Sequence, residues 1–174
     1  MQALTFWKTV TMDYSNLLEN LIDLLKKHDI RFCVIGGQAV NAYAEPLVSL
    51  DLDLVVAVDQ IDKVEALFEK QFVVKRFPHS LNVTVPHSDI RVQIQTDERY
   101  GSFLERASMR SVLGMELPVA SVEDVLQGKI WAALDSERRG SKRQKDLADI
   151  ARILENYPQY RSRMPKEILN RLLD

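Results

Sequence analysis

Two short strand-like segments separated by a pair of glycines constrain the fold of this chain more than any other feature. Residues 31–35 read Arg-Phe-Cys-Val-Ile, an apolar run typical of a buried strand, and Gly36-Gly37 ends it. A short helix is predicted over residues 38–44, and a second strand rich in Leu and Val is predicted over residues 50–58. A helix that connects two apolar strands indicates a sheet covered by helices.

The remaining pattern extends this arrangement along the chain. Further helices are predicted over residues 14–27, 59–71, 100–107, 122–137, 142–156 and 166–173. Further strands are predicted over residues 73–77, 81–85 and 90–95, and in a hairpin made by residues 111–113 and 115–120. This order indicates an α/β (α+β) fold, with an α/β core over residues 1–120 and a helical part over residues 121–174 packed on it as one compact unit.

Side chains able to cap helices precede three of the predicted helices. Asp13 or Ser15 is expected to cap the helix over residues 14–27, and Ser141 the helix over residues 142–156. Ser121 opens a Ser-Val-Glu-Asp sequence that resembles a capping box.

Composition limits the cellular setting but not the partner. The chain has 174 residues, of which 46% are hydrophobic, enough for a single core. Its longest apolar runs are far shorter than the roughly 18 residues that a transmembrane helix needs, and its first residues lack the pattern of a secretory signal. The single cysteine, Cys33, cannot form an internal disulfide, which fits a reducing cytoplasm. The formal net charge of -2 excludes no class of partner.

The second predicted strand carries the residues with the clearest chemistry. Residues i and i+2 of a strand point to the same face, so Asp51 and Asp53 are expected to project together. Two neighbouring carboxylates repel each other, and a divalent cation such as Mg²⁺ relieves that repulsion while it binds substrate phosphates. The turn at Gly36-Gly37, before a helix, lets a phosphate approach free backbone N–H groups. Together these features predict metal-assisted phosphoryl or nucleotidyl transfer.

Each feature also has a purely structural interpretation. Asp51 and Asp53 could lie at a strand edge in solvent, and a glycine pair after a buried strand is often only a turn. Their order on successive strands, about a dozen residues apart, favours the chemical interpretation.

With these residues the chain resembles the nucleotidyltransferase superfamily, which has the DNA polymerase β-like fold. In that family a Gly-Gly or Gly-Ser turn opens a helix and an Asp-x-Asp on the next strand binds metal. The helix segment Leu126 to Ala133, which contains Lys129, and the Lys-Asp-x-x-Asp segment Lys145 to Asp149 are most similar to AbiEii-type toxins and uncharacterised nucleotidyltransferases. The resemblance extends from about Tyr14 to Glu155.

The resemblance implies a fold, a site and partners. The fold would be a mixed sheet flanked by helices, and Asp51 and Asp53 would be catalytic and would bind Mg²⁺ or Mn²⁺. Nucleotide binding would involve Gly36, Gly37, Ser49, Lys129 and Lys145. Asp146 would orient Lys145 or an active-site arginine. The partners would be an NTP, an RNA, protein or small-molecule acceptor, and a cognate antitoxin, in the cytoplasm and away from membranes.

Two positions depart from the family pattern. A third carboxylate is expected on a later strand, and the matching segment Arg91 to Ile94 has Gln93 there, which offers a carbonyl oxygen without charge. Leu47 replaces an arginine that relatives often carry before the first aspartate. Asp89 is the only nearby carboxylate, but it lies four residues before Gln93, and a slip of one residue would change its face.

These departures leave two hypotheses open. The first is a metal-dependent transferase that moves NMP from an NTP to an acceptor hydroxyl. The second is a catalytically impaired domain of the same fold that binds nucleotide or a partner without turnover. Residues 1–128 carry twelve basic and eighteen acidic side chains, whereas residues 129–166 carry ten and five. The basic segment could receive nucleic acid or could be an ordinary solvated helical surface.

Overall fold

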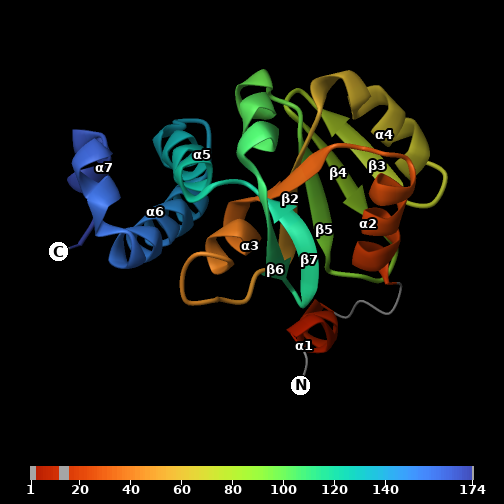
Figure 1. Ribbon diagram of the computed structural model, residues 1–174, viewed down its shortest axis with the longest axis horizontal. Coiled ribbons are helices and arrows are strands. Elements are labelled where there is room, and N and C mark those ends of the chain that lie inside the picture. Colours follow the sequence, from red (N-terminus) through yellow and green to blue (C-terminus); the bar gives the residue numbers. More distant parts are fainter. Residues whose placement is uncertain (1–2, 12–15, 174) are drawn as a thin grey trace.

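One mixed sheet organises the molecule. The computed structural model describes residues 3–11 and 16–173, in which seven strands follow the spatial order β3-β4-β5-β2-β1-β7-β6 (Figure 1). Their bounds are β1 Phe32–Ile35, β2 Asp51–Val56, β3 Val73–Phe77, β4 Ser80–Thr84, β5 Arg91–Gln95, β6 Ser108–Val112 and β7 Met115–Val119. The α/β fold class and the mixed sheet flanked by helices predicted from the sequence are confirmed.

The strand order places the first two predicted strands at the centre of the sheet. β1 pairs with β2 in antiparallel fashion, and β2 pairs with β5 in parallel fashion. In this register Asp53 lies between Ile35 of β1 and Gln93 of β5. The centre of the sheet therefore brings together residues from three separate parts of the sequence.

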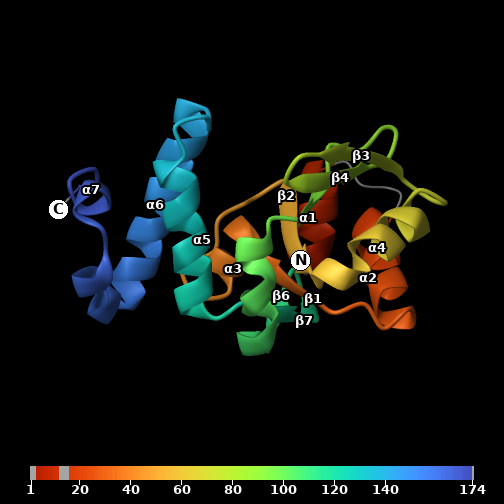
Figure 2. The ribbon, with the colours of Figure 1, turned by 90° about the horizontal axis from the view of Figure 1, so that it is seen from above.

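Helices cover the sheet on both sides, as Figures 1 and 2 show. Helices α2 and α4 lie on one side, while α3, α5 and α6 lie together on the other. Their bounds are α1 Ala3–Thr11, α2 Leu17–Lys27, α3 Gly36–Asn41, α4 Ile61–Phe68, α5 Val122–Leu134, α6 Gly140–Asn156 and α7 Lys166–Leu169. Three 3₁₀ segments, η1 Val58–Gln60, η2 Glu98–Arg106 and η3 Pro158–Arg163, join them.

Apolar spacing in the sequence explains the core. The leucines and isoleucine of α2 form one buried face, namely Leu17, Leu18, Leu21, Ile22 and Leu25. On the sheet, Leu52 and Leu54 of β2 and Val92 and Ile94 of β5 are fully buried. Because strand side chains alternate, the polar residues between them face the other side, toward α3, α5 and α6.

Several predicted boundaries differ from the structure. The predicted helix over residues 38–44 begins earlier, at Gly36, and the one over residues 100–107 is the 3₁₀ segment η2. Ser121 caps α5 as expected, since its hydroxyl accepts a hydrogen bond from the N–H of Asp124 at 3.2 Å. The expected cap at Ser141 is wrong, because Arg139 occupies that position and its carbonyl already accepts the first helical hydrogen bonds. Asp13 and Ser15 lie outside the described residues.

No described helix is long and apolar enough to cross a lipid bilayer.

Candidate functional site

The two aspartates of β2 line a pocket of about 270 Å³ between the sheet and the helices α5 and α6. Leu52 and Leu54, which alternate with them, have no exposed surface and point into the core. Asp51 and Asp53 therefore share the other face, as the spacing predicts, and both reach the pocket.

The backbone of Gly36 lies directly beside the side chain of Asp53. Its φ is +67°, a value that L side chains rarely adopt, and a Cβ at this position would overlap the carboxylate of Asp53. A Cβ on Gly37 would instead lie 3.5 Å from the hydroxyl oxygen of Ser49. The glycine turn thus packs directly against the strand that carries the carboxylates.

Ser49 anchors the segment that leads into β2. Its hydroxyl donates to the carbonyl of Asp51 at 3.3 Å, and its own carbonyl accepts from the indole of Trp7 at 2.6 Å and the amide of Gln38 at 3.2 Å. The serine is buried and is not among the residues lining the pocket. In this structure Ser49 supports Asp51 from outside the pocket.

The parallel pairing of β2 with β5 decides which residue occupies the third position. Gln93 is the direct neighbour of Asp53 and lines the same pocket, while Asp89 precedes the strand. Arg91 lies beside Asp51, with its Nε 3.2 Å from the Oδ1 of that aspartate. Among the described residues, no group of three His, Cys, Asp or Glu side chains could hold a metal ion.

Electrostatics favour a cation beside Asp53. Burial raises the pKa of Asp53 to about 6, and the charge of Asp51 adds to this, while Lys129, Arg138 and Lys145 oppose it. Two carboxylates and the amide oxygen of Gln93 form an oxygen donor set of the kind that Mg²⁺ and Mn²⁺ accept. The residues present fit a divalent cation, with one negative charge fewer than three carboxylates would provide.

Lys129 lines the pocket and is held by ion pairs. Its Nζ lies 3.0 Å from Asp146 Oδ1 and 2.7 Å from Asp149 Oδ2, and the lysine is 8% exposed. Burial lowers its pKa, but the two carboxylates outweigh this effect and raise the pKa of Lys129 above its usual value. The lysine therefore remains charged and links α5 to α6.

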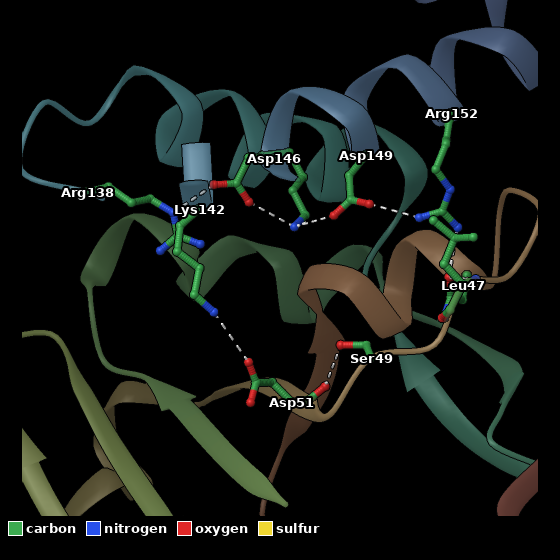
Figure 3. Close-up of polar contacts among 10 residues, drawn as sticks. Leu47, Ser49, Asp51, Arg138, Lys142, Asp146, Asp149 and Arg152 are labelled. Carbon is green, nitrogen blue, oxygen red and sulfur yellow. Dashed lines mark hydrogen bonds and ion pairs between the residues drawn. The ribbon is translucent and has the colours of Figure 1, made fainter. Parts of the chain in front are cut away.

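Each of these carboxylates has a second cationic partner, as Figure 3 shows. Asp146 Oδ2 accepts from Arg138 Nε at 2.7 Å, and Asp149 Oδ1 accepts from Arg152 Nη1 at 2.8 Å. Asp146 thus contacts an arginine that lines the pocket. Lys145 is exposed on α6 outside the pocket lining, although its charge reaches Asp53.

Comparison with known proteins identifies the family of the chain that has this geometry. A family model described as "Nucleotidyl transferase AbiEii toxin, Type IV TA system" matches residues 50–173, which include β2 and all of α5 and α6. The chain belongs to the AbiEii nucleotidyltransferase family. The resemblance inferred from Asp51, Asp53 and the two C-terminal helices is therefore confirmed. No curated protein matches the chain.

Solved structures share the fold of this AbiEii family member. The antibiotic-resistance factor ANT(2'')-Ia has a TM-score of 0.58 and 13% identity, with 89% of this chain and 94% of that chain covered. The lincosamide antibiotic adenylyltransferase LnuA has a TM-score of 0.52 and 14% identity, with coverage of 80% and 97%. An antigenic nucleotidyltransferase-like protein from Paracoccidioides brasiliensis has a TM-score of 0.53 and 19% identity, with coverage of 86% and 75%.

The AbiEii family member also contains cations that sequence reasoning missed. Arg138, in the turn before α6, and Lys142, in the first turn of that helix, line the pocket with Arg91. Lys142 Nζ lies 3.9 Å from Asp51 Oδ2 (Figure 3). The excess of basic residues after Lys129 pointed to this part of the chain. It did not indicate which of those side chains face the carboxylates.

Arg152 braces the segment before β2 in this family member. Its Nη2 donates to Asn41 Oδ1 at 2.8 Å and also contacts the carbonyl of Glu45. Asn41 in turn binds both backbone groups of Leu47, at 2.7 and 3.0 Å. The guanidinium that reaches this segment therefore comes from α6, more than a hundred residues along the chain.

Proposed function

We propose that this protein is a metal-dependent nucleotidyltransferase that transfers NMP from an NTP to an acceptor hydroxyl. The observation that carries the proposal is the convergence of Asp51, Asp53 and Gly36 on one pocket that cationic side chains also line. The reaction joins the acceptor oxygen to the α-phosphorus, breaks the bond to the bridging oxygen, and releases pyrophosphate and a proton.

Asp51, Asp53 and Gln93 would hold Mg²⁺ or Mn²⁺ in this proposal. The bound ion would offset negative charge on the phosphates while one P–O bond forms and the other breaks. The chain's own cations, Arg138, Lys142 and Arg91, would attract and orient the triphosphate. Gly36 and Gly37 would let the phosphates approach the backbone, and Ser49 would support these glycines. Lys129 and Lys145 are further candidates for nucleotide binding. Lys129 would act from the position in which its ion pair with Asp146 holds it.

The acceptor and the partners belong to the same proposal. The family description refers to toxins of toxin–antitoxin systems, and two neighbours of similar fold are named for antibiotics. An RNA, a protein or a small molecule with a free hydroxyl is therefore a candidate acceptor. A cognate antitoxin is a candidate partner, and the cytoplasm is the proposed location.

A specific observation supports a second candidate function. The strand register puts Gln93, which cannot act as a base, beside Asp53 in place of a third carboxylate. A domain that binds nucleotide or a protein partner without turnover would fit this substitution.

A transfer experiment separates the two candidates. The protein is incubated with each α-labelled NTP, Mg²⁺ or Mn²⁺, and mixed tRNA or cell lysate, beside Asp51→Asn, Asp53→Asn and the control Asp59→Asn, whose side chain is exposed outside the pocket. The proposal expects label on an acceptor with wild type and Asp59→Asn, and none with either pocket variant. Binding of NTP without label transfer under any metal would favour the binding domain.

Gln93→Asp tests the third position in the same assay. Since it restores a carboxylate beside Asp53, we expect tighter Mn²⁺ binding and faster transfer. If neither changes, Gln93 does not contribute to the metal site.

A further inference from the structure

One wall of the pocket is aromatic and comes from η2. Tyr100 and Phe103 both line the pocket, and their ring centroids are 5.1 Å apart. Trp131 of α5 packs edge-on against Tyr100 at 5.2 Å and stacks on Phe103 at 6.0 Å. These contacts hold the Tyr100 ring in place against its aromatic neighbours.

The hydroxyl is the part of Tyr100 left for a ligand. The residue is 8% exposed, and no hydrogen bond described within residues 3–11 and 16–173 involves its hydroxyl. The hydroxyl is not among the described polar atoms that are fully buried without a partner, so it keeps some access to the pocket. Burial raises the pKa of Tyr100, so the phenol keeps its proton near neutral pH and can donate it in a hydrogen bond.

A glycine inside α5 makes room for this side chain. Glycine in a helix interior is less favourable than alanine by about 1 kcal/mol. A Cβ on Gly128 would lie only 3.3 Å from Tyr100 Cε1 and 3.9 Å from its hydroxyl oxygen. Gly128 thus lets the ring lie against the helix backbone, with its hydroxyl at the pocket.

The charges around the hydroxyl indicate the chemistry of its partner. Arg91, Arg138 and Lys142 line the same pocket, but so do Asp51, Asp53, Asp124 and Asp146, so the lining suits a phosphate chain that carries a divalent cation. We propose that the Tyr100 hydroxyl donates a hydrogen bond to a phosphate oxygen of the bound nucleoside triphosphate. This inference rests on the proposed function, and it assigns the phosphate chain, rather than the base, to the η2 wall.

Tyr100→Phe removes the hydroxyl while it keeps the ring packing. Binding is measured by calorimetry with Mg²⁺, using inorganic tripolyphosphate and the four α,β-methylene NTPs, which resist transfer. We expect affinity for tripolyphosphate and for the preferred NTP analogue to fall together by roughly tenfold, as for a lost hydrogen bond to a charged oxygen, with an unchanged melting temperature. Tyr157→Phe, which changes a tyrosine outside the pocket, should bind like wild type.

The outcomes distinguish the two proposals. A loss confined to the NTP analogues, with tripolyphosphate unaffected, would mean that the hydroxyl contacts the nucleoside and would overturn the inference. Unchanged binding of every probe by Tyr100→Phe would also overturn it, while label transfer by wild type would leave the proposed function standing. If wild type neither binds these probes nor transfers label, the proposed function fails first.

Gly128→Ala tests the same contact from the helix side. The added methyl should displace Tyr100 and weaken tripolyphosphate binding several-fold, although alanine is the better helix former. Gly140→Ala is the matched control, because a Cβ there meets nothing within 4 Å. In a Tyr100→Phe background, Gly128→Ala should weaken binding little further, and a full additional loss would contradict the shared contact.

Discussion

At the scale of single residues, Gly36 determines how closely the backbone approaches the metal candidates. Its positive φ makes alanine unfavourable by about 1–2 kcal/mol, and the Cβ would overlap the Asp53 carboxylate. We therefore expect Gly36→Ala to lower the free energy of unfolding and also to abolish Mn²⁺ binding, measured by urea denaturation and titration calorimetry. Gly114→Ala is the control, since Gly114 has a similar φ of +81° and open space around it. Equal Mn²⁺ binding by the two variants would contradict the close approach.

The thiol of Cys33 is predicted to be unreactive in the folded protein. It has no exposed surface on β1, and burial, with a smaller contribution from Asp124, raises the pKa of its thiol to about 12. At pH 8 almost none of it is thiolate, so we expect reaction with a disulfide reagent to be roughly a hundredfold or more slower than in urea-unfolded protein. Comparable rates in the two states would show that β1 is accessible.

At the scale of elements, Lys129 joins α5 to α6. Breaking a buried ion pair leaves a charge uncompensated, although Asp146 and Asp149 would keep their arginine partners. We expect Lys129→Met to lower the free energy of unfolding by about 3 kcal/mol, whereas Lys145→Met on exposed α6 surface should change it by less than about 0.5 kcal/mol. Urea denaturation measures both, and similar small effects would mean that the network does not stabilise the helix pair.

Arg152 connects α6 to the segment that enters β2. Arg152→Ala removes its hydrogen bonds to Asn41, Asp149 and the Glu45 carbonyl, and should lower stability by about 1–3 kcal/mol. Hydrogen exchange should also increase at residues 47–50, because Leu47 N–H depends on Asn41 for its acceptor. Arg139→Ala, on exposed surface, is the control. Unchanged hydrogen exchange over residues 47–50 in Arg152→Ala would show that Arg152 does not hold this segment in place.

Local patterns predicted the elements of the site but not its long-range partners. Alternation placed Asp51 and Asp53 on one face, and the glycine pair marked the turn beside them. The adjacency of Gln93 and Asp53 needs the parallel pairing of strands forty residues apart, which periodicity does not specify. Asp149 does pair with Arg152 at helical spacing, whereas its contact with Lys129 depends on how α5 lies on α6.

At the scale of the whole molecule, the small net charge results from two parts of opposite sign. The acidic part holds the β2 aspartates and the basic part holds Arg138 and Lys142, and the pocket lies where they meet. A triphosphate with a divalent cation complements both sides, because the cation matches the carboxylates and the phosphates match Arg138 and Lys142. Residues from both parts are therefore needed to form the site.

In the proposed reaction, Asp51 and Asp53 form the metal and nucleotide site. Anomalous diffraction from crystals grown with Mn²⁺ and an α,β-methylene NTP tests it most directly. We predict a manganese peak within about 2–2.5 Å of oxygens from both aspartates, with the phosphates beside Gly36 and the Tyr100 hydroxyl. A nucleotide bound elsewhere, or bound in this pocket with no manganese at either carboxylate, would show that Asp51 and Asp53 do not form this site.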